Sequence, residues 1–193
     1  MFDVKGNKDL EPETSNYFSS SIERYNKNNN ITIKYYYHQI DNMIASIFET
    51  ENDQMIYKNF QSVLINGIDM YIKARFSNFA VNTTISIIDP KDKTFNHQLE
   101  GSNKFSFNSS YIYFLNNDLS NINLNYRYIS DTYYEDNNIP QYSIMNLSYN
   151  YKIFKKISIS LGIDNLINTT AVKNRMTMYP DRRYYFTISF NNK

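Results

Sequence analysis

The chain has 193 residues, and its 20 Lys and Arg residues nearly balance its 19 Asp and Glu residues, for a formal net charge of +1. A chain so balanced lacks the basic footprint that nucleic acid or an anionic membrane surface attracts. Cysteine is absent, which excludes disulfides, thiolate zinc sites and cysteine nucleophiles.

The composition favours strands over helices, because 19 Tyr and 13 Phe accompany many β-branched residues and only four Gly and four Pro. No apolar run approaches the roughly 18 residues of a membrane-spanning helix. No basic-then-apolar leader follows Met1. The sequence therefore predicts neither a transmembrane helix nor a signal peptide.

Apolar and polar residues alternate along most of the chain with the two-residue period of a strand that has one wet face. The pattern is clearest in residues 157–164, where one face carries Ile157, Ile159, Leu161 and Ile163. All four prolines are expected at or beyond strand ends, since proline cannot donate to a ladder. In chain order we expect about nine strands, near residues 15–25, 31–43, 58–76, 79–88, 104–115, 119–130, 141–153, 156–166 and 183–190.

The expected connections alternate between short and long. The short ones lie near residues 26–30, 77–78, 116–118 and 154–155, and the long ones at 44–57, 89–103, 131–140 and 167–182. Short turns on one rim and long loops on the other are typical of outer-membrane barrels. The alternation of apolar and polar residues is less decisive, because strands of soluble antiparallel sheets show it too. An odd strand count places the chain ends on opposite rims, whereas a complete bacterial barrel has an even count. The pattern predicts an all-β, antiparallel up-and-down meander that is part of a barrel.

Two glycines and two histidines stand out within this pattern. Gly67 and Gly162 interrupt expected strands, which suggests a bulge or the close approach of another backbone. His38 falls on the polar face of its strand and is expected to face the barrel lumen. His38 and His97 lie far apart and lack the partner spacing of a metal site or a catalytic triad.

Four segments resemble TonB-dependent outer-membrane receptors in sequence and in order. Residues 7–15 read NKDLEPETS and resemble the family's NPDLKPETS, which opens a late strand. Residues 66–69 (NGID) resemble its YGVE strand, and residues 161–168 (LGIDNLIN) resemble LGVxNLFD before the last outside loop. Residues 180–190 (PDRRYYFTISF) resemble the closing strand, which normally begins PGRxYY. Lys8 and Asp181 depart from the pattern, as do three residues after Phe190.

The resemblance implies the C-terminal portion of a transmembrane β-barrel in the outer membrane. Family members carry an N-terminal plug and a barrel of roughly 22 strands, of which about the last nine are found here. Residues 1–193 are thus expected to be a partial barrel without a plug, from a receptor for a scarce nutrient such as a ferric siderophore, haem or cobalamin. A truncated or split form would not transport alone. Its implied partners are the lipid bilayer, the rest of the barrel and plug, the inner-membrane TonB complex and the barrel assembly machinery.

Candidate ligand residues lie in the expected outside loops. Tyr133, Tyr134, Glu135 and Asp136 place carboxylates beside aromatic rings, a combination able to coordinate a cation or stack on a sugar or catechol ring. Arg175 in the last loop is suited to an anionic chelate. A merely solvated acidic loop is the simpler interpretation of residues 131–136.

Two other functions stay open on the sequence alone. One is a passive porin-like or adhesin-like outer-membrane module that closes on itself or oligomerises, without a plug or energy coupling. The other is a soluble all-β sandwich that binds carbohydrate through its tyrosines. An enzyme is not expected, because no acid and base pair, nucleophile arrangement or phosphate-cradling loop emerges, and neither a cofactor nor a metal site is predicted.

Overall fold

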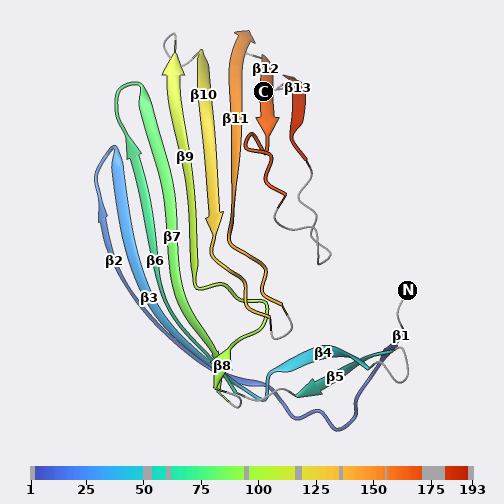
Figure 1. Cartoon of the computed structure of the whole chain (residues 1–193). Coiled ribbons are helices and arrows are strands. Elements are labelled where there is room, and N and C mark those ends of the chain that lie inside the picture. Colours follow the sequence, from blue (N-terminus) through green and yellow to red (C-terminus); the bar gives the residue numbers. More distant parts are fainter. Residues whose placement is uncertain are drawn as a thin grey trace.

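The computed structural model describes residues 3–49, 54–59, 62–93, 96–115, 119–134, 137–154, 156–170 and 181–190. Nine long strands form one twisted, curved sheet (Figure 1). Within the described residues, no helix is long and apolar enough to cross a membrane. The nine strands are β2 (Thr14–Tyr25), β3 (Asn29–Asp41), β6 (Val63–Arg75), β7 (Phe79–Asp92), β9 (Phe105–Leu115), β10 (Ser120–Ile129), β11 (Tyr142–Phe154), β12 (Ile157–Asp164) and β13 (Arg183–Phe190).

The order of the strands confirms the expected meander. Neighbours in the sheet follow chain order from β2 to β13, and every pair among the nine is antiparallel. The sheet is open, with β2 at one edge and β13 at the other. Thr14 pairs with Asp41 beside a long connection, and Phe190 pairs with Ile157 beside a short turn. The sheet therefore begins on the long-loop side and ends on the short-turn side, as the odd count predicts.

Three shorter strands lie in connections that we expected to be loops, and a fourth lies before the first expected strand. They are β1 (Asp3–Lys5), β4 (Ile44–Glu49), β5 (Gln54–Asn59) and β8 (His97–Gln98). β4 and β5 form a hairpin, to which β1 adds in parallel. The long connection at 44–57 was thus predicted wrongly, and the next barrel strand begins at Val63 rather than near residue 58. Residues 58–59, which we assigned to that strand, belong to the hairpin.

Proline placement needs one correction. Pro90 was expected at or beyond a strand end, but it lies inside β7 and is buried. Pro90 lies near the long-loop end of β7, two residues before the strand ends at Asp92. Its carbonyl accepts a hydrogen bond from the Leu99 backbone N–H at 3.0 Å. The missing proline donor is therefore tolerated close to the end of the ladder.

The faces of the sheet follow the predicted period. Paired residues place Ile122, Leu147 and Leu161 on one face, where Ile122 is 40% and Leu161 48% exposed. The buried hydrophobic residues of the described chain are few, namely Val63, Ile129 and Ile144. A soluble sandwich would cover this apolar face with a second sheet, and no described element does so. The face suits lipid, and the described sheet lacks the second packed layer that the soluble carbohydrate-binding sandwich requires.

The opposite face is polar and hollowed. A cavity of about 530 Å³ on it is lined largely by amide, hydroxyl and basic side chains, including Asn82, Asn108, Asn125 and Arg127. His38 lies on this face, with its ring 5.4 Å from that of Tyr17 in an edge-on contact. The polar face is the lumen wall of the barrel segment, which confirms the place predicted for His38.

Gly67 and Gly162 each lie beneath a tyrosine of the neighbouring strand. Gly67 pairs with Tyr36, and Gly162 pairs with Tyr185. A Cβ on Gly67 would lie 2.3 Å from Cζ of Tyr36, and one on Gly162 would lie 2.2 Å from Cζ of Tyr185. The register continues through both glycines, so the expected bulge is wrong, and what approaches is a ring rather than a backbone. Aromatic rings that cover strand glycines pin the register of a sheet.

Candidate ligand-binding loops at the long-loop rim

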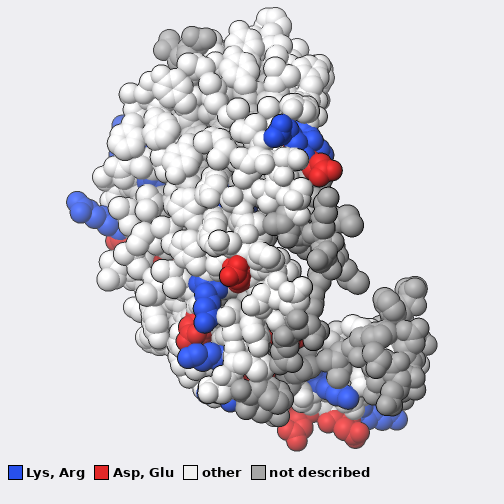
Figure 2. Space-filling model, in the orientation of Figure 1, with Lys and Arg blue, Asp and Glu red and all other residues white. Residues whose placement is uncertain are grey.

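The long connections gather at one end of the sheet, seen at the bottom of Figure 1. We call this end the long-loop rim and define it as the described parts of residues 7–13, 41–62, 89–104, 130–141 and 164–183. Acidic groups predominate there, and red atoms gather at the lower end of Figure 2. Among rim residues with described side chains, the carboxylates are Asp9, Glu11, Glu13, Asp41, Asp89, Asp92, Glu100, Asp131, Asp164 and Asp181, against Lys8, Lys58, Lys91, Lys93, Lys104, Arg182 and Arg183.

The segment before β2 fastens the β4–β5 hairpin to the barrel. The amide of Asn59 donates to the carbonyls of Glu11 and Asn42, both at 2.9 Å, and accepts from the Glu11 N–H at 2.8 Å. The Glu13 carboxylate accepts the Ile44 N–H at 3.0 Å, and Asn42 Nδ2 donates to the Glu11 carboxylate at 3.1 Å. The polar residues of the NKDLEPETS segment therefore hold the base of an outside hairpin.

Asp41, the last residue of β3, ties the end of that strand to the residue before β6. Its carboxylate accepts hydrogen bonds from the Ser62 hydroxyl and from the Gln39 amide, the latter at 3.0 Å. These donors, with Ser62 the larger influence, lower the pKa of Asp41 from its ordinary value of 3.8. The carboxylate is therefore ionised at neutral pH, where it accepts both bonds.

The two middle loops pair with each other. Gly101 N–H donates to the Tyr133 carbonyl at 2.8 Å, and Tyr133 N–H donates to the Ser102 carbonyl at 2.9 Å. Single bridges join Thr132 to Asn103 and to Ile139. Gly101 has a φ of 73°, a conformation that glycine adopts at no steric cost. Backbone bonds thus hold the 97–104 and 130–141 loops together as one surface.

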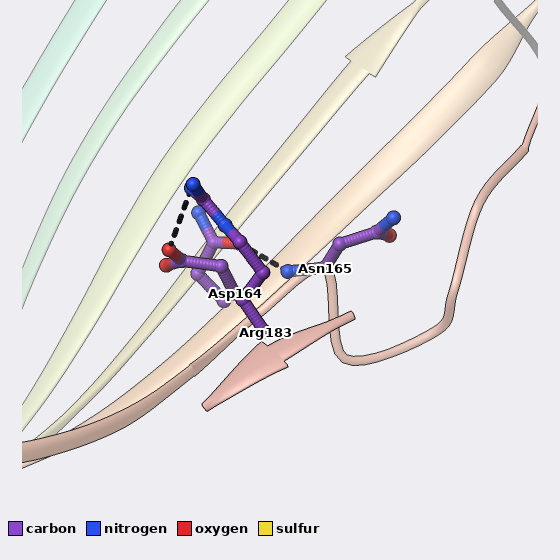
Figure 3. A network of polar contacts seen from close by, with 4 residues as sticks. Asp164, Asn165 and Arg183 are labelled. Atoms are coloured by element: carbon purple, nitrogen blue, oxygen red, sulfur yellow. Dashed lines mark hydrogen bonds and ion pairs between the residues drawn. The ribbon is translucent and has the colours of Figure 1, made fainter. Parts of the chain in front are cut away.

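The base of the last loop is built around Asn165, which is 3% exposed and has a φ of 52°. Its side chain accepts the Thr169 N–H at 2.8 Å and donates to the Thr169 carbonyl at 3.1 Å, while its own N–H donates to Oδ1 of Asn146 at 2.8 Å. Beside it, Arg183 and Asp164 form an ion pair at 3.2 Å across β12 and β13 (Figure 3). This turn fixes where the loop leaves the barrel.

Replacing Asn165 by alanine should lower the free energy of unfolding of the assembled barrel by about 3 kcal/mol. The change leaves part-buried Thr169 backbone groups unpaired and forces alanine into a left-handed backbone. Asn165→Gly should cost less, since it keeps the backbone freedom and loses only the side-chain bonds. Urea unfolding in vesicles measures both variants, and equal losses for alanine and glycine would contradict the contribution of the positive φ.

The predicted ligand residues are only partly within the described structure. Tyr133 and Tyr134 lie in the paired middle loops, where the Tyr134 N–H donates to Asn138 Oδ1 at 3.0 Å. Glu135, Asp136 and Arg175 lie outside the described residues. Sequence reasoning did not connect His97 with this loop, yet its ring lies 5.8 Å from that of Tyr133. No sequence signal links them, because only the pairing of the two loops brings them together.

No group of three or more His, Cys, Asp or Glu residues in the described parts of the chain is placed to hold a metal ion. The middle loops instead offer aromatic rings, amides and a histidine on an ordered backbone. Such a surface can stack on rings and hydrogen-bond to polar ligand groups.

The TonB dependent receptor-like β-barrel family model matches residues 1–166 of the chain. The chain belongs to the TonB-dependent receptor family. The family resemblance drawn from the sequence motifs is therefore confirmed, and the outer membrane is the location that the family occupies. Members of this family are receptors and transporters, which supports the expectation that the chain is not an enzyme.

Solved TonB-dependent receptors share the fold of the chain. The siderophore receptor PirA of Acinetobacter baumannii is 17% identical with a TM-score of 0.78, over 97% of this chain and 33% of PirA. The copper transporter OprC is 11% identical with a TM-score of 0.80, over 95% of this chain and 32% of OprC. The ferric enterobactin receptor PfeA of Pseudomonas aeruginosa is 15% identical with a TM-score of 0.77, over 97% of this chain and 32% of PfeA. The chain spans about a third of these receptors, and no curated protein sequence matches it.

Proposed function

We propose that this chain is the C-terminal barrel portion of an energised receptor that takes up a scarce nutrient, such as a ferric siderophore, haem or cobalamin. It anchors the receptor in the bilayer and supplies outside loops to ligand capture. The rest of the barrel and a plug would complete the receptor, the inner-membrane TonB complex would act through that plug, and the barrel assembly machinery would insert it. The observation that carries the proposal is a receptor-like sheet whose long loops are braced by side-chain and backbone hydrogen bonds.

The braced loops support capture rather than passive permeation. The hairpin, the middle loops and the base of the last loop are each fixed to the barrel end by hydrogen bonds of about 3 Å, among them Glu11 to Asn59 and Thr169 to Asn165. Ordered loops lose little entropy when a ligand binds. We propose that Tyr133, Tyr134, Glu135, Asp136 and Arg175 contribute contacts to that ligand.

A passive barrel formed by this segment alone is the second candidate, and strand direction disfavours it. β2 and β13 both run from the long-loop rim to the short-turn rim. Closing the segment on itself, or on a second copy around an axis along the membrane normal, would join these strands in parallel, whereas the nine-strand meander pairs antiparallel throughout. A partner sheet with an odd number of strands restores antiparallel pairing at both edges.

Removing the rings of Tyr133 and Tyr134 should reduce nutrient uptake at least tenfold at low ligand concentration, because stacking and ring contacts are lost. Whole cells that carry the complete receptor are given labelled ferric siderophore, haem or cobalamin in separate assays. The transported ligand identifies the substrate class, and loss of uptake on collapsing the proton gradient establishes energy coupling.

A matched double variant, Tyr149→Ala with Tyr151→Ala on the apolar face of β11, controls for the loss of two tyrosines. It should leave nutrient uptake unchanged. Uptake of none of the three ligands, or uptake that persists without the proton gradient, would contradict the proposed function and favour a passive module.

A further inference from the structure

The short turns carry an excess of basic side chains. We define the short-turn rim as the described parts of residues 23–30, 73–80, 113–122 and 151–158, which the hairpin turns bring to one end of the sheet. Glu23 is the carboxylate in this described set. Its basic residues are all exposed, and they are Arg24, Lys27, Lys73, Arg75, Lys152 and Lys156.

The charge on this rim is opposite to that on the long-loop rim, where carboxylates predominate. The opposite charges of the two rims nearly cancel in the net charge of the chain. The net charge of +1 therefore gave no sign of a basic surface. Up-and-down threading sends successive turns to the same end, so separate basic positions become one band. A potential depends on where charges lie and not on their total.

Exposed aromatic and apolar side chains accompany the basic ones. Phe76 is 60%, Phe154 68% and Phe190 72% exposed. Phe76 and Phe190 follow the apolar parity of their strands, and Phe154 pairs with Ile157 of the apolar face after a register shift at the end of β11. Arg24 shares that parity on β2, because it pairs with Ile31 of the apolar face. Aromatic rings together with basic heads on flexible stems mark the boundary between hydrocarbon and headgroups.

We propose that the short-turn rim binds the phosphates of anionic phospholipids in the adjacent membrane leaflet. This rests on the placement of the chain in the outer membrane, whose inner leaflet faces the short turns. Arg24, Lys27 and Lys156 form the outer part of the site, because Arg24 lies on the lipid-facing side and the lysines lie in or beside turns. Arg75 contributes less, since its guanidinium lies 4.2 Å from the ring centroid of Phe114.

A lipid fits this band better than an acidic protein. The bases lie in the same band as side chains that would enter hydrocarbon, such as Phe154 and Phe190. A soluble acidic partner would leave these rings against water or force them into the partner. Lipid satisfies both parts at once, with acyl chains on the rings and phosphate on the bases.

The test uses the protein purified from outer membranes in the form in which it occurs there. It is reconstituted in phosphatidylcholine with spin-labelled phosphatidylglycerol or spin-labelled phosphatidylcholine as the probe. We expect a preference for phosphatidylglycerol that falls with added salt. Arg24→Gln, Lys27→Gln and Lys156→Gln together should reduce that preference by roughly fivefold per side chain, the equivalent of about 1 kcal/mol each.

A matched triple variant, Lys8→Gln, Lys58→Gln and Lys93→Gln, removes as much charge from the long-loop rim and should leave the preference unchanged. Heat modifiability on gels verifies that both variants are folded. Two results with the unaltered protein would overturn the proposal. They are equal binding of the two labelled lipids and a preference for phosphatidylglycerol that survives added salt. Competition by soluble glycerol phosphate would instead assign the band to a free anion. Nutrient uptake is assayed separately, so failure here leaves the receptor proposal standing.

Discussion

Produced without the strands that complete the barrel, residues 1–193 are expected not to insert stably into a bilayer. β2 and β13 each leave one row of backbone N–H and C=O groups unpaired. Hydrocarbon offers no partner for these groups, and each unsatisfied one costs several kcal/mol. The expected products are aggregates or mixed assemblies that do not shift on gels when heated.

The measurement combines heat modifiability with conductance in planar bilayers, and co-production with the remaining barrel strands is the positive control. A monomeric, heat-modifiable and ion-conducting product from the segment alone would sink this prediction. Since the chain contains no cysteine, Ser21→Cys on β2 and Thr187→Cys on β13 provide a clean second readout. A disulfide between these edge positions within one copy would show that the segment closes on itself, whereas a disulfide between copies is compatible with the expected assemblies.

Replacing Gly162 by alanine is expected to destabilise the assembled barrel by about 1 to 3 kcal/mol, the usual cost of overpacking. The new Cβ would lie 2.2 Å from Cζ of Tyr185, so the ring must leave its position over β12. Without that ring, alanine in a strand is favoured over glycine by roughly 0.5 to 1 kcal/mol. The sign of the effect therefore depends on Tyr185.

A double-mutant cycle isolates this dependence. In a Tyr185→Ser background, Gly162→Ala should be neutral or stabilising in urea unfolding. Gly6→Ala is the matched control, because nothing lies within 4 Å of a Cβ at Gly6. An equal loss from Gly162→Ala with and without the tyrosine would contradict the ring contact. The same cycle applies to Gly67 and Tyr36, where the corresponding distance is 2.3 Å.

Alternation predicted the barrel strands because a strand with one lipid face and one polar face repeats every two residues. The alternate residues from Ile157 to Ile163 lie on the apolar face as expected. β13 spans the predicted range 183–190. The β4–β5 hairpin was missed because its strands are only six residues each, and they lie between two much longer ones. The family motifs could also be recognised in the sequence, although the hydrogen bonds that Glu13 and Asn165 make within them could not.

The loop contacts required the tertiary structure. Tyr133 was singled out from its neighbours in sequence, whereas its contacts with His97, Gly101 and Ser102 come from a second loop about 30 residues away. Likewise, Gly162 was marked as unusual, but only the β12–β13 register identifies Tyr185 as the reason. Such pairs have no period to reveal them.

By itself the sequence determined the strand pattern, its two faces, the alternation of turn lengths and the receptor family. Each of these can be recognised from residues that lie close together in the sequence. The tertiary structure decided which side chains meet. It showed that Tyr36 and Tyr185 cover glycines and that two loops form one surface. It also showed that charges balanced along the chain are separated between two rims. The physical reason is that antiparallel threading returns every second connection to the same end, so residues far apart in sequence share one environment.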